Sequence, residues 1–282
     1  MKELPKLCRW LSAEACLVRG EDMKIIVCIK QVPDTTEVRI NPETGTLMRE
    51  GVPSIMNPDD KAALEAALRI KDELGAHVIG LSMGPKQADD VLREALAMGA
   101  DECYLLTDRA FGGADTWATS STLAAAIKKI DCDLVLTGRQ AIDGDTAQVG
   151  PGIAEHLGLP NLSYAEEIRI DNGDVVVKQQ FDDRVHTVRA AMPALVTVLS
   201  ELNEPRYMTP GGIFAAYREK EVTVWQRDDI EIEDENIGLK GSPTRVAKSF
   251  PKSVKAPGMK INTGVDESVQ FIVDKLKEKY IL

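Results

Sequence analysis

The sequence lacks the features of several large protein classes. No apolar run in its 282 residues approaches the roughly 20 residues of a membrane span. The formal net charge is −11, and Lys and Arg form no basic patch of the kind that nucleic-acid binding requires. The five cysteines are widely spaced without a C-x-x-C pair, which fits a reducing cytosol. We therefore expect a cytoplasmic protein with no membrane span and no nucleic-acid partner.

The usual signatures of small-molecule chemistry are missing as well. Neither G-x-x-x-x-G-K-[ST] nor G-x-G-x-x-G occurs, which argues against an ordinary P-loop ATPase or NAD dehydrogenase. His77, His156 and His186 are scattered, so no metal site is predicted. Cys28 lies in an apolar strand as a small buried residue, and no Ser-His-Asp or Cys-His arrangement is visible. We expect no catalytic residue and no metal.

Strands and helices alternate from Met23 onward. The Ile- and Val-rich stretch 24–32 predicts a buried strand. A helix follows from Asn57, which can cap it, to about Leu74, with Pro58 at its first position. Three more strand and helix pairs then follow, with strands at 76–84, 101–108 and 133–138 and helices at 85–99, 115–130 and 146–156. This order predicts an α/β fold with an open, mostly parallel twisted sheet and helices on both faces.

The pattern changes after Pro160. Residues 162–199 read as several consecutive strands, and Asn172-Gly173 is a hairpin signal, so we expect an antiparallel addition to the parallel sheet. From about Glu201 periodic order is lost, except for a helix near the C-terminus at 266–279. An extended arm of this kind can wrap its own domain or lie on a partner subunit.

These patterns divide the chain into three parts. Residues 1–22 form an N-terminal extension of unknown role, either a short added helix or sequence upstream of a start at Met23. Residues 23–200 form the α/β domain, and residues 201–282 form the arm. Ligands of open parallel sheets bind beyond the carboxyl ends of the strands, so the loops that follow the strands are the candidate sites.

The loop at 138–152 is the most informative of these. Its small residues let backbone N–H groups approach a phosphate, Arg139 supplies a cation, and Thr146 and Gln148 supply neutral donors ahead of a helix N-terminus. It is therefore a candidate pyrophosphate cradle, and the alternative is a connecting loop that binds nothing. Asp143 and Asp145 are interpreted as loop carboxylates that cap the next helix.

Several blocks of sequence, taken in order, resemble the β subunit of electron-transfer flavoproteins, including its FixA-like members. They are VCIKQVPDT, NPDDKAALEAALRIK, SMGP, EALAMGAD, LTGRQAIDGDTAQVGP, LNEPRY and GLKGSPTRV. The family's characteristic segment is present as VVKQQFDDRVHTVRAAMPALVT, with Phe181 where an acid is usual and His186 where Glu or Gln is usual. The resemblance runs from Met23 into the C-terminal region.

The resemblance implies a heterodimer with a larger α subunit that carries FAD. The β subunit then holds a second nucleotide, FAD or, in the alternative, AMP. The implied cofactor contacts are Cys28, Asn57, Asp60, Met83, Gly138, Arg139, Gln140, Gly144, Thr146, Gln148 and Val149. The implied docking residues for a partner dehydrogenase are Asn203, Glu204, Pro205, Arg206 and Tyr207.

The small residues of GRQAIDGDTAQVGP and FGGADTWATS resemble the bifurcating, two-FAD branch. In that branch NADH reduces the β-subunit flavin, one electron goes to ferredoxin or flavodoxin, and the other goes through the α-subunit FAD to an acyl-CoA dehydrogenase or related flavoenzyme. Three alternatives remain: an AMP-containing electron shuttle without NADH chemistry, a universal-stress-like nucleotide-binding module, and a nucleotide-hydrolysing or adenylating protein. The missing lysine motif argues against the last.

Overall fold

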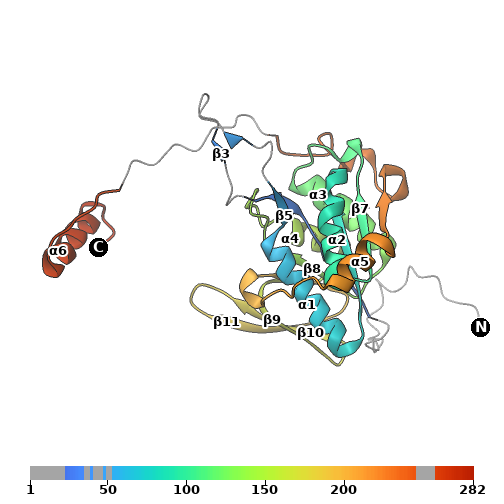
Figure 1. The fold of residues 1–282 in the computed structure, drawn as a ribbon, viewed down its shortest axis with the longest axis horizontal. Coiled ribbons are helices and arrows are strands. Elements are labelled where there is room, and N and C mark those ends of the chain that lie inside the picture. Colours follow the sequence, from blue (N-terminus) through green and yellow to red (C-terminus); the bar gives the residue numbers. More distant parts are fainter. Residues whose placement is uncertain (1–22, 35–38, 41–46, 49–52, 246–257) are drawn as a thin grey trace, which may run out of the picture. The chain divides into compact units, whose positions relative to one another are not determined.

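The computed structural model describes residues 23–34, 39–40, 47–48, 53–245 and 258–282 (Figure 1). The chain divides into two compact units, Met1–Val246 and Ala247–Leu282. The predicted N-terminal extension, residues 1–22, lies outside the described residues.

A nine-stranded sheet forms the centre of the first unit, in the order β11-β10-β9-β12-β8-β1-β6-β7-β13. Its strands are β1 (Lys24–Cys28), β6 (His77–Met83), β7 (Glu102–Leu106), β8 (Leu134–Gly138), β9 (Asn161–Asp171), β10 (Asp174–Gln180), β11 (Val185–Ala191), β12 (Ala194–Val198) and β13 (Val222–Trp225). Pairing is parallel from β9 to β13, and only β10 and β11 are added antiparallel. The predicted open, mostly parallel sheet is confirmed.

Alternate side chains of the central strands enter two separate cores. On β1, Ile25 and Val27 pack with helices α1 (Pro58–Leu74) and α2 (Asp89–Met98), whereas Ile26 and Cys28 pack with α3 (Thr116–Ile130) and α4 (Val149–Leu157). Successive residues of a strand point to opposite faces, so a strand that is apolar throughout needs cover on both sides. Helices on both faces are therefore required by the sequence of β1.

The chain between β1 and α1 holds short antiparallel pairs. β2 (Gln31–Pro33) pairs with β5 (Ser54–Met56), and β3 (Arg39–Ile40) pairs with β4 (Leu47–Met48). The two brief strands predicted around the turn at 42–45 are thus present, while that turn lies outside the described residues.

The structure corrects three details of the predicted strands and helices. The strand predicted at 24–32 divides into β1 and β2, and β2 lies in a separate two-stranded sheet. β12 pairs in parallel with β8 and β9, so it belongs to the parallel sheet rather than to the antiparallel addition. Helix α4 begins at Val149 instead of near Thr146, because Asp145 and Ala147 adopt positive φ angles of 49° and 52°, which no α-helix allows. The predicted hairpin at Asn172-Gly173 is confirmed, with φ angles of 54° and 87° between β9 and β10.

More of the chain beyond residue 200 is ordered than the sequence predicts. Helix α5 (Pro210–Arg218) packs on α2, and β13 adds a strand to the outer edge of β7. The buried side chains of Ile230 and Ile237 join the core beneath α3. These elements were missed because they are short and their apolar residues carry no clear period.

The second unit contains helix α6 (Val265–Glu278), where a helix was predicted, and none of its residues is buried. Among the residues that the structure describes, no helix combines the length and the apolar character needed to cross a membrane.

Candidate functional site

A cavity of about 610 Å³ opens at the carboxyl ends of β1, β6 and β8. This is where the order of the strands reverses, because β1 is followed by β6 on one side and by β8 on the other. All of the predicted cofactor residues except Asn57 line it. The fold therefore brings together residues that lie as far apart in the sequence as Cys28 and Val149.

Asn57 occupies the N-cap position of α1, as predicted, but its side chain makes no capping hydrogen bond and binds the loop behind the cavity. Its Nδ2 donates to the carbonyl oxygen of Gln140 at 2.8 Å, and its Oδ1 accepts from the N–H of Ile142 at 3.1 Å. The side chain is fully buried, so both groups need these partners. The side-chain cap is absent because the loop after β8 uses the same amide group.

Asp60 joins the ends of two neighbouring strands. Its Oδ2 accepts from the N–H of Lys30 at 2.8 Å, just after β1, and its Oδ1 accepts from the N–H of Gly138 at 3.1 Å, at the end of β8. Burial raises the pKa of Asp60 to about 7, although these hydrogen bonds lower it. Asp60 thus lines the cavity and also fixes the spacing of its two walls.

Arg139 follows Gly138 and lines the same cavity. Its Nε lies 3.5 Å from Oδ2 of the buried Asp59, and both atoms are buried without a hydrogen-bond partner among the described residues. Burial raises the pKa of Asp59, which the positive charge of Arg139 opposes. The guanidinium is therefore only loosely held by protein groups and suits an anionic ligand.

The carboxylates of the loop do not cap α4, contrary to the sequence interpretation. Asp143 accepts two hydrogen bonds from Nζ of Lys30, at 2.7 and 2.9 Å, and this ion pair joins the loops after β8 and β1. Asp145 accepts from Nε2 of Gln140 at 3.1 Å. The described residues contain no group of three His, Cys, Asp or Glu side chains that could hold a metal ion.

The far side of the cavity is more apolar. Leu81, Met83, Phe111 and Leu123 line it next to the buried Cys28. Burial raises the pKa of the Cys28 thiol well above its usual range, so the thiol stays neutral. A cavity with Arg139 at one wall and aromatic and aliphatic side chains at the other fits a nucleotide with a planar ring.

Sequence reasoning missed Thr244, which lines the cavity from far along the chain. Thr244 belongs to the block GLKGSPTRV, which carries part of the family resemblance and lies in the region beyond Glu201 without periodic order. Its two glycines and its proline were a sign of a tightly packed turn, but nothing in the sequence shows which loop the turn packs against.

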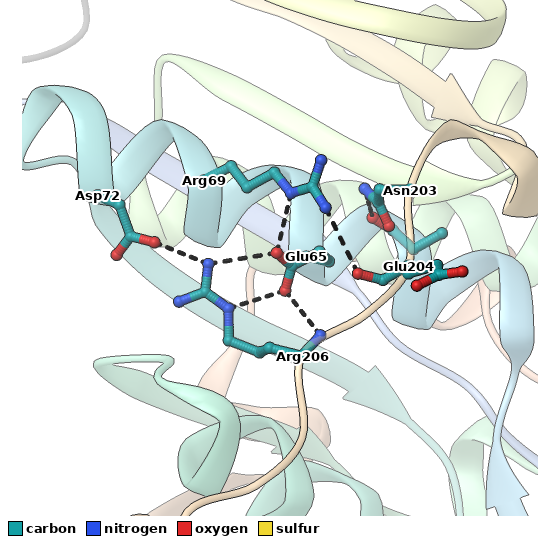
Figure 2. A network of polar contacts seen from close by, with 7 residues as sticks. Glu65, Arg69, Asp72, Asn203, Glu204 and Arg206 are labelled. Carbon is teal, nitrogen blue, oxygen red and sulfur yellow. Dashed lines mark hydrogen bonds and ion pairs between the residues drawn. The ribbon is translucent and has the colours of Figure 1, made fainter.

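Three of the five predicted docking residues, Asn203, Glu204 and Arg206, are held by α1 (Figure 2). Arg206 donates from Nε and Nη2 to Glu65, at 2.8 and 3.3 Å, and from Nη2 to Asp72 at 2.7 Å. Asn203 donates to the carbonyl oxygen of Ala62 at 3.0 Å. The side chain of Glu65 is only 5% exposed, so its charge depends on these partners.

Glu204 joins this network only through its backbone, because its carbonyl oxygen accepts from Nη2 of Arg69 at 3.5 Å. Tyr207 is 93% exposed, and Glu204 is also exposed. Exposed apolar side chains of α5, those of Ile213, Phe214 and Tyr217, follow in the chain. The loop and α5 thus present exposed aromatic and aliphatic side chains close together in the sequence.

Comparison with known proteins shows the family to which this chain belongs. Residues 44–230 match the electron transfer flavoprotein domain. The electron transfer flavoprotein subunit beta of Clostridium acetobutylicum is 57% identical over 260 residues, which cover 92% of this chain and 100% of that protein. This chain belongs to the electron transfer flavoprotein β-subunit family.

Two further relatives of this β subunit are named for the complexes that contain them. The caffeyl-CoA reductase-Etf complex subunit CarD of Acetobacterium woodii is 57% identical over 263 residues, covering 92% of this chain and 100% of that protein. The acryloyl-CoA reductase electron transfer subunit gamma of Anaerotignum propionicum is 44% identical over 268 residues, with the same coverage. These similarities agree with the family resemblance that the sequence blocks indicated.

Proposed function

We propose that this β subunit binds FAD in the cavity at the ends of β1 and β8, receives electrons from NADH, and works in the cytoplasm as half of a heterodimer with an α subunit. One electron goes to ferredoxin or flavodoxin, and the other goes through the α-subunit FAD to an acyl-CoA dehydrogenase or related flavoenzyme. CarD, with its named place in a caffeyl-CoA reductase-Etf complex, supports an acyl-CoA flavoenzyme as the partner.

The observation that carries the proposal is the cavity itself. Its wall combines the loop from Gly138 to Gly150, the loosely paired Arg139, and an apolar side formed by Phe111 and Leu123. These residues fit a dinucleotide, because small residues and Arg139 suit the phosphates and the apolar side suits a ring. When bound, FAD supplies both two-electron and one-electron chemistry.

The chain's own residues position the cofactor. Asp60 and Asn57 hold the loop after β8 against α1, and the ion pair between Lys30 and Asp143 spans from this loop to the one after β1. An electron carrier needs no general acid; it needs a fixed distance between redox centres and an environment that sets the potential. The docking loop from Asn203 to Tyr207 meets the dehydrogenase in this proposal.

Replacing Arg139 with Ala is expected to lower the retention of the nucleotide by about tenfold, since a charge-assisted contact to a phosphate is lost. Retention is measured as nucleotide per heterodimer after extensive dialysis, with the released nucleotide identified by absorbance and mass. Arg139→Lys keeps the charge and is expected to be intermediate. The exposed Arg218 gives a matched control as Arg218→Ala. If Arg139→Ala kept full nucleotide occupancy, Arg139 would not bind the phosphates. Extraction of AMP in place of FAD would indicate the AMP-containing electron shuttle.

A further inference from the structure

The segment Gly238–Thr244, here called the strap, lies against the cofactor cavity although it comes from late in the chain. Thr244 lines the cavity beside Asp115 and Thr116, which begin α3. The compact first unit continues through this segment to Val246, so the strap is part of the α/β unit.

Asp115 fastens the strap to the start of α3. Its Oδ2 accepts from the N–H of Thr244 at 2.9 Å and from the Thr244 hydroxyl at 2.6 Å, while its own N–H donates to Oγ of Ser242 at 2.8 Å. Its Oδ1 caps α3 through the N–H of Ala118 at 3.1 Å. Burial opposes ionisation, but the hydrogen bonds from Thr244 and Ala118 hold the pKa of Asp115 below its ordinary value, so the fastening is charged at neutral pH.

The rest of the strap fits closely onto the loop that precedes α3. The N–H of Leu239 donates to the carbonyl oxygen of Gly112 at 3.0 Å, and the buried Ser242 hydroxyl donates to the carbonyl oxygen of Gly238 at 2.7 Å. A Cβ on Gly238, whose φ is +55°, would lie 2.0 Å from the carbonyl oxygen of Ala110. The path of the strap is therefore fixed against the loop that carries Phe111 into the cavity.

We propose that the strap Gly238–Thr244 is part of the cofactor site and that its attachment to Asp115 sets how long the nucleotide stays bound. The inference rests on the proposed function, because it takes the cavity to hold a nucleotide. The strap and the loop before α3 together form one wall of the cavity, so a ligand gains a way out when this wall opens. Local openings of this kind are limited by the hydrogen bonds that must break, and those at Asp115 involve a charged group.

The test uses the complete heterodimer with FAD bound and compares Thr244→Val and Ser242→Ala with the unchanged protein. Release of FAD is followed by the rise in its fluorescence after dilution. Thr244→Val removes the hydroxyl hydrogen bond to Asp115, and Ser242→Ala removes the acceptor of the Asp115 N–H together with the hydrogen bond to Gly238. We expect release to be about tenfold faster in each variant. Thr223→Val, at an exposed position of β13, is the matched control and should release FAD at the unchanged rate. Heat unfolding of the FAD-free heterodimers checks that the variants remain folded.

The possible outcomes distinguish a failure of the strap inference from a failure of the proposed function. FAD release at the unchanged rate in both folded variants would overturn the role of the strap while leaving the cofactor site in place. If the purified heterodimer holds AMP, the same comparison is made with the release of labelled AMP, and the same ratio is expected. A β subunit that holds neither nucleotide would overturn the proposed function, and the strap inference with it.

Discussion

Replacing Arg206 with Met is expected to lower the free energy of unfolding by about 2–3 kcal/mol at neutral pH. The reason is the carboxylate of Glu65, which stays buried when Arg206 no longer donates to it from its side chain. The usual cost of leaving a buried charge unpaired is higher, but Arg69 still donates to Glu65 at 3.0 Å, so we expect a smaller loss. Met keeps most of the length of the side chain and hence its packing. Urea unfolding followed by circular dichroism gives the measurement.

The effect of Arg206→Met should depend on pH. Burial opposes ionisation of Glu65, yet the hydrogen bonds from Arg206 and Arg69 outweigh it and hold the pKa below its ordinary value of 4.5. A lowered pKa in the folded state contributes stability that is present above the unfolded-state pKa and is lost as the pH falls through the folded-state pKa. The difference in unfolding free energy between the two proteins should therefore shrink below about pH 4.5.

Two further variants show whether the cause is the unpaired charge. Glu65→Gln combined with Arg206→Met should recover much of the stability, because no buried charge is then left. Arg218→Met removes an exposed cation from α5 and should change the free energy by less than about 0.5 kcal/mol. An Arg206→Met protein as stable as the unchanged one would show that α1 does not hold the docking loop through this network.

Replacing Gly138 with Ala is expected to abolish tight binding of the nucleotide. A Cβ at this position would lie 2.3 Å from Oδ1 of Asp60 and 2.8 Å from its backbone nitrogen. The end of β8 and the start of α1 would have to move apart, which breaks the hydrogen bond from Gly138 to Asp60. We expect retention of the nucleotide to fall by more than about tenfold and the unfolding free energy to fall by about 1–3 kcal/mol.

Gly144 provides the matched control for this change. It also lines the cavity, but a Cβ there would meet nothing within 4 Å. Gly144→Ala should therefore keep its stability, so it controls for the effect of an added Cβ on folding, while equilibrium dialysis with FAD gives the affinity of Gly138→Ala and of the unchanged protein. Equal affinity in Gly138→Ala and the unchanged protein would mean that the close approach of β8 to Asp60 does not shape the site.

The sequence predicts the sheet and the region of the site because both follow from local patterns. Strands that are apolar throughout, each followed by a helix, define the parallel sheet, and the rule for such sheets places a ligand beyond strand ends such as Gly138. The small residues and Arg139 then mark the loop after β8 as the wall most suited to phosphate.

The parts that could not be predicted depend on contacts between distant segments. Asn57 has the residue type of a cap, but its amide binds a loop more than eighty residues further along the chain. Thr244 lines the cavity, where Asp115 binds it across 129 residues. β13 is a four-residue edge strand, too short to give a period.

The most direct test of the central claim is the reaction of the purified heterodimer with NADH. The chain is co-produced with its α subunit, the flavins per heterodimer are counted after denaturation, and the absorbance of the native protein is followed as NADH is added. We predict two FAD per heterodimer and rapid bleaching by NADH. One FAD accompanied by bound AMP, with no bleaching by NADH, would contradict a flavin in the β-subunit cavity and would make this family member a simple electron shuttle.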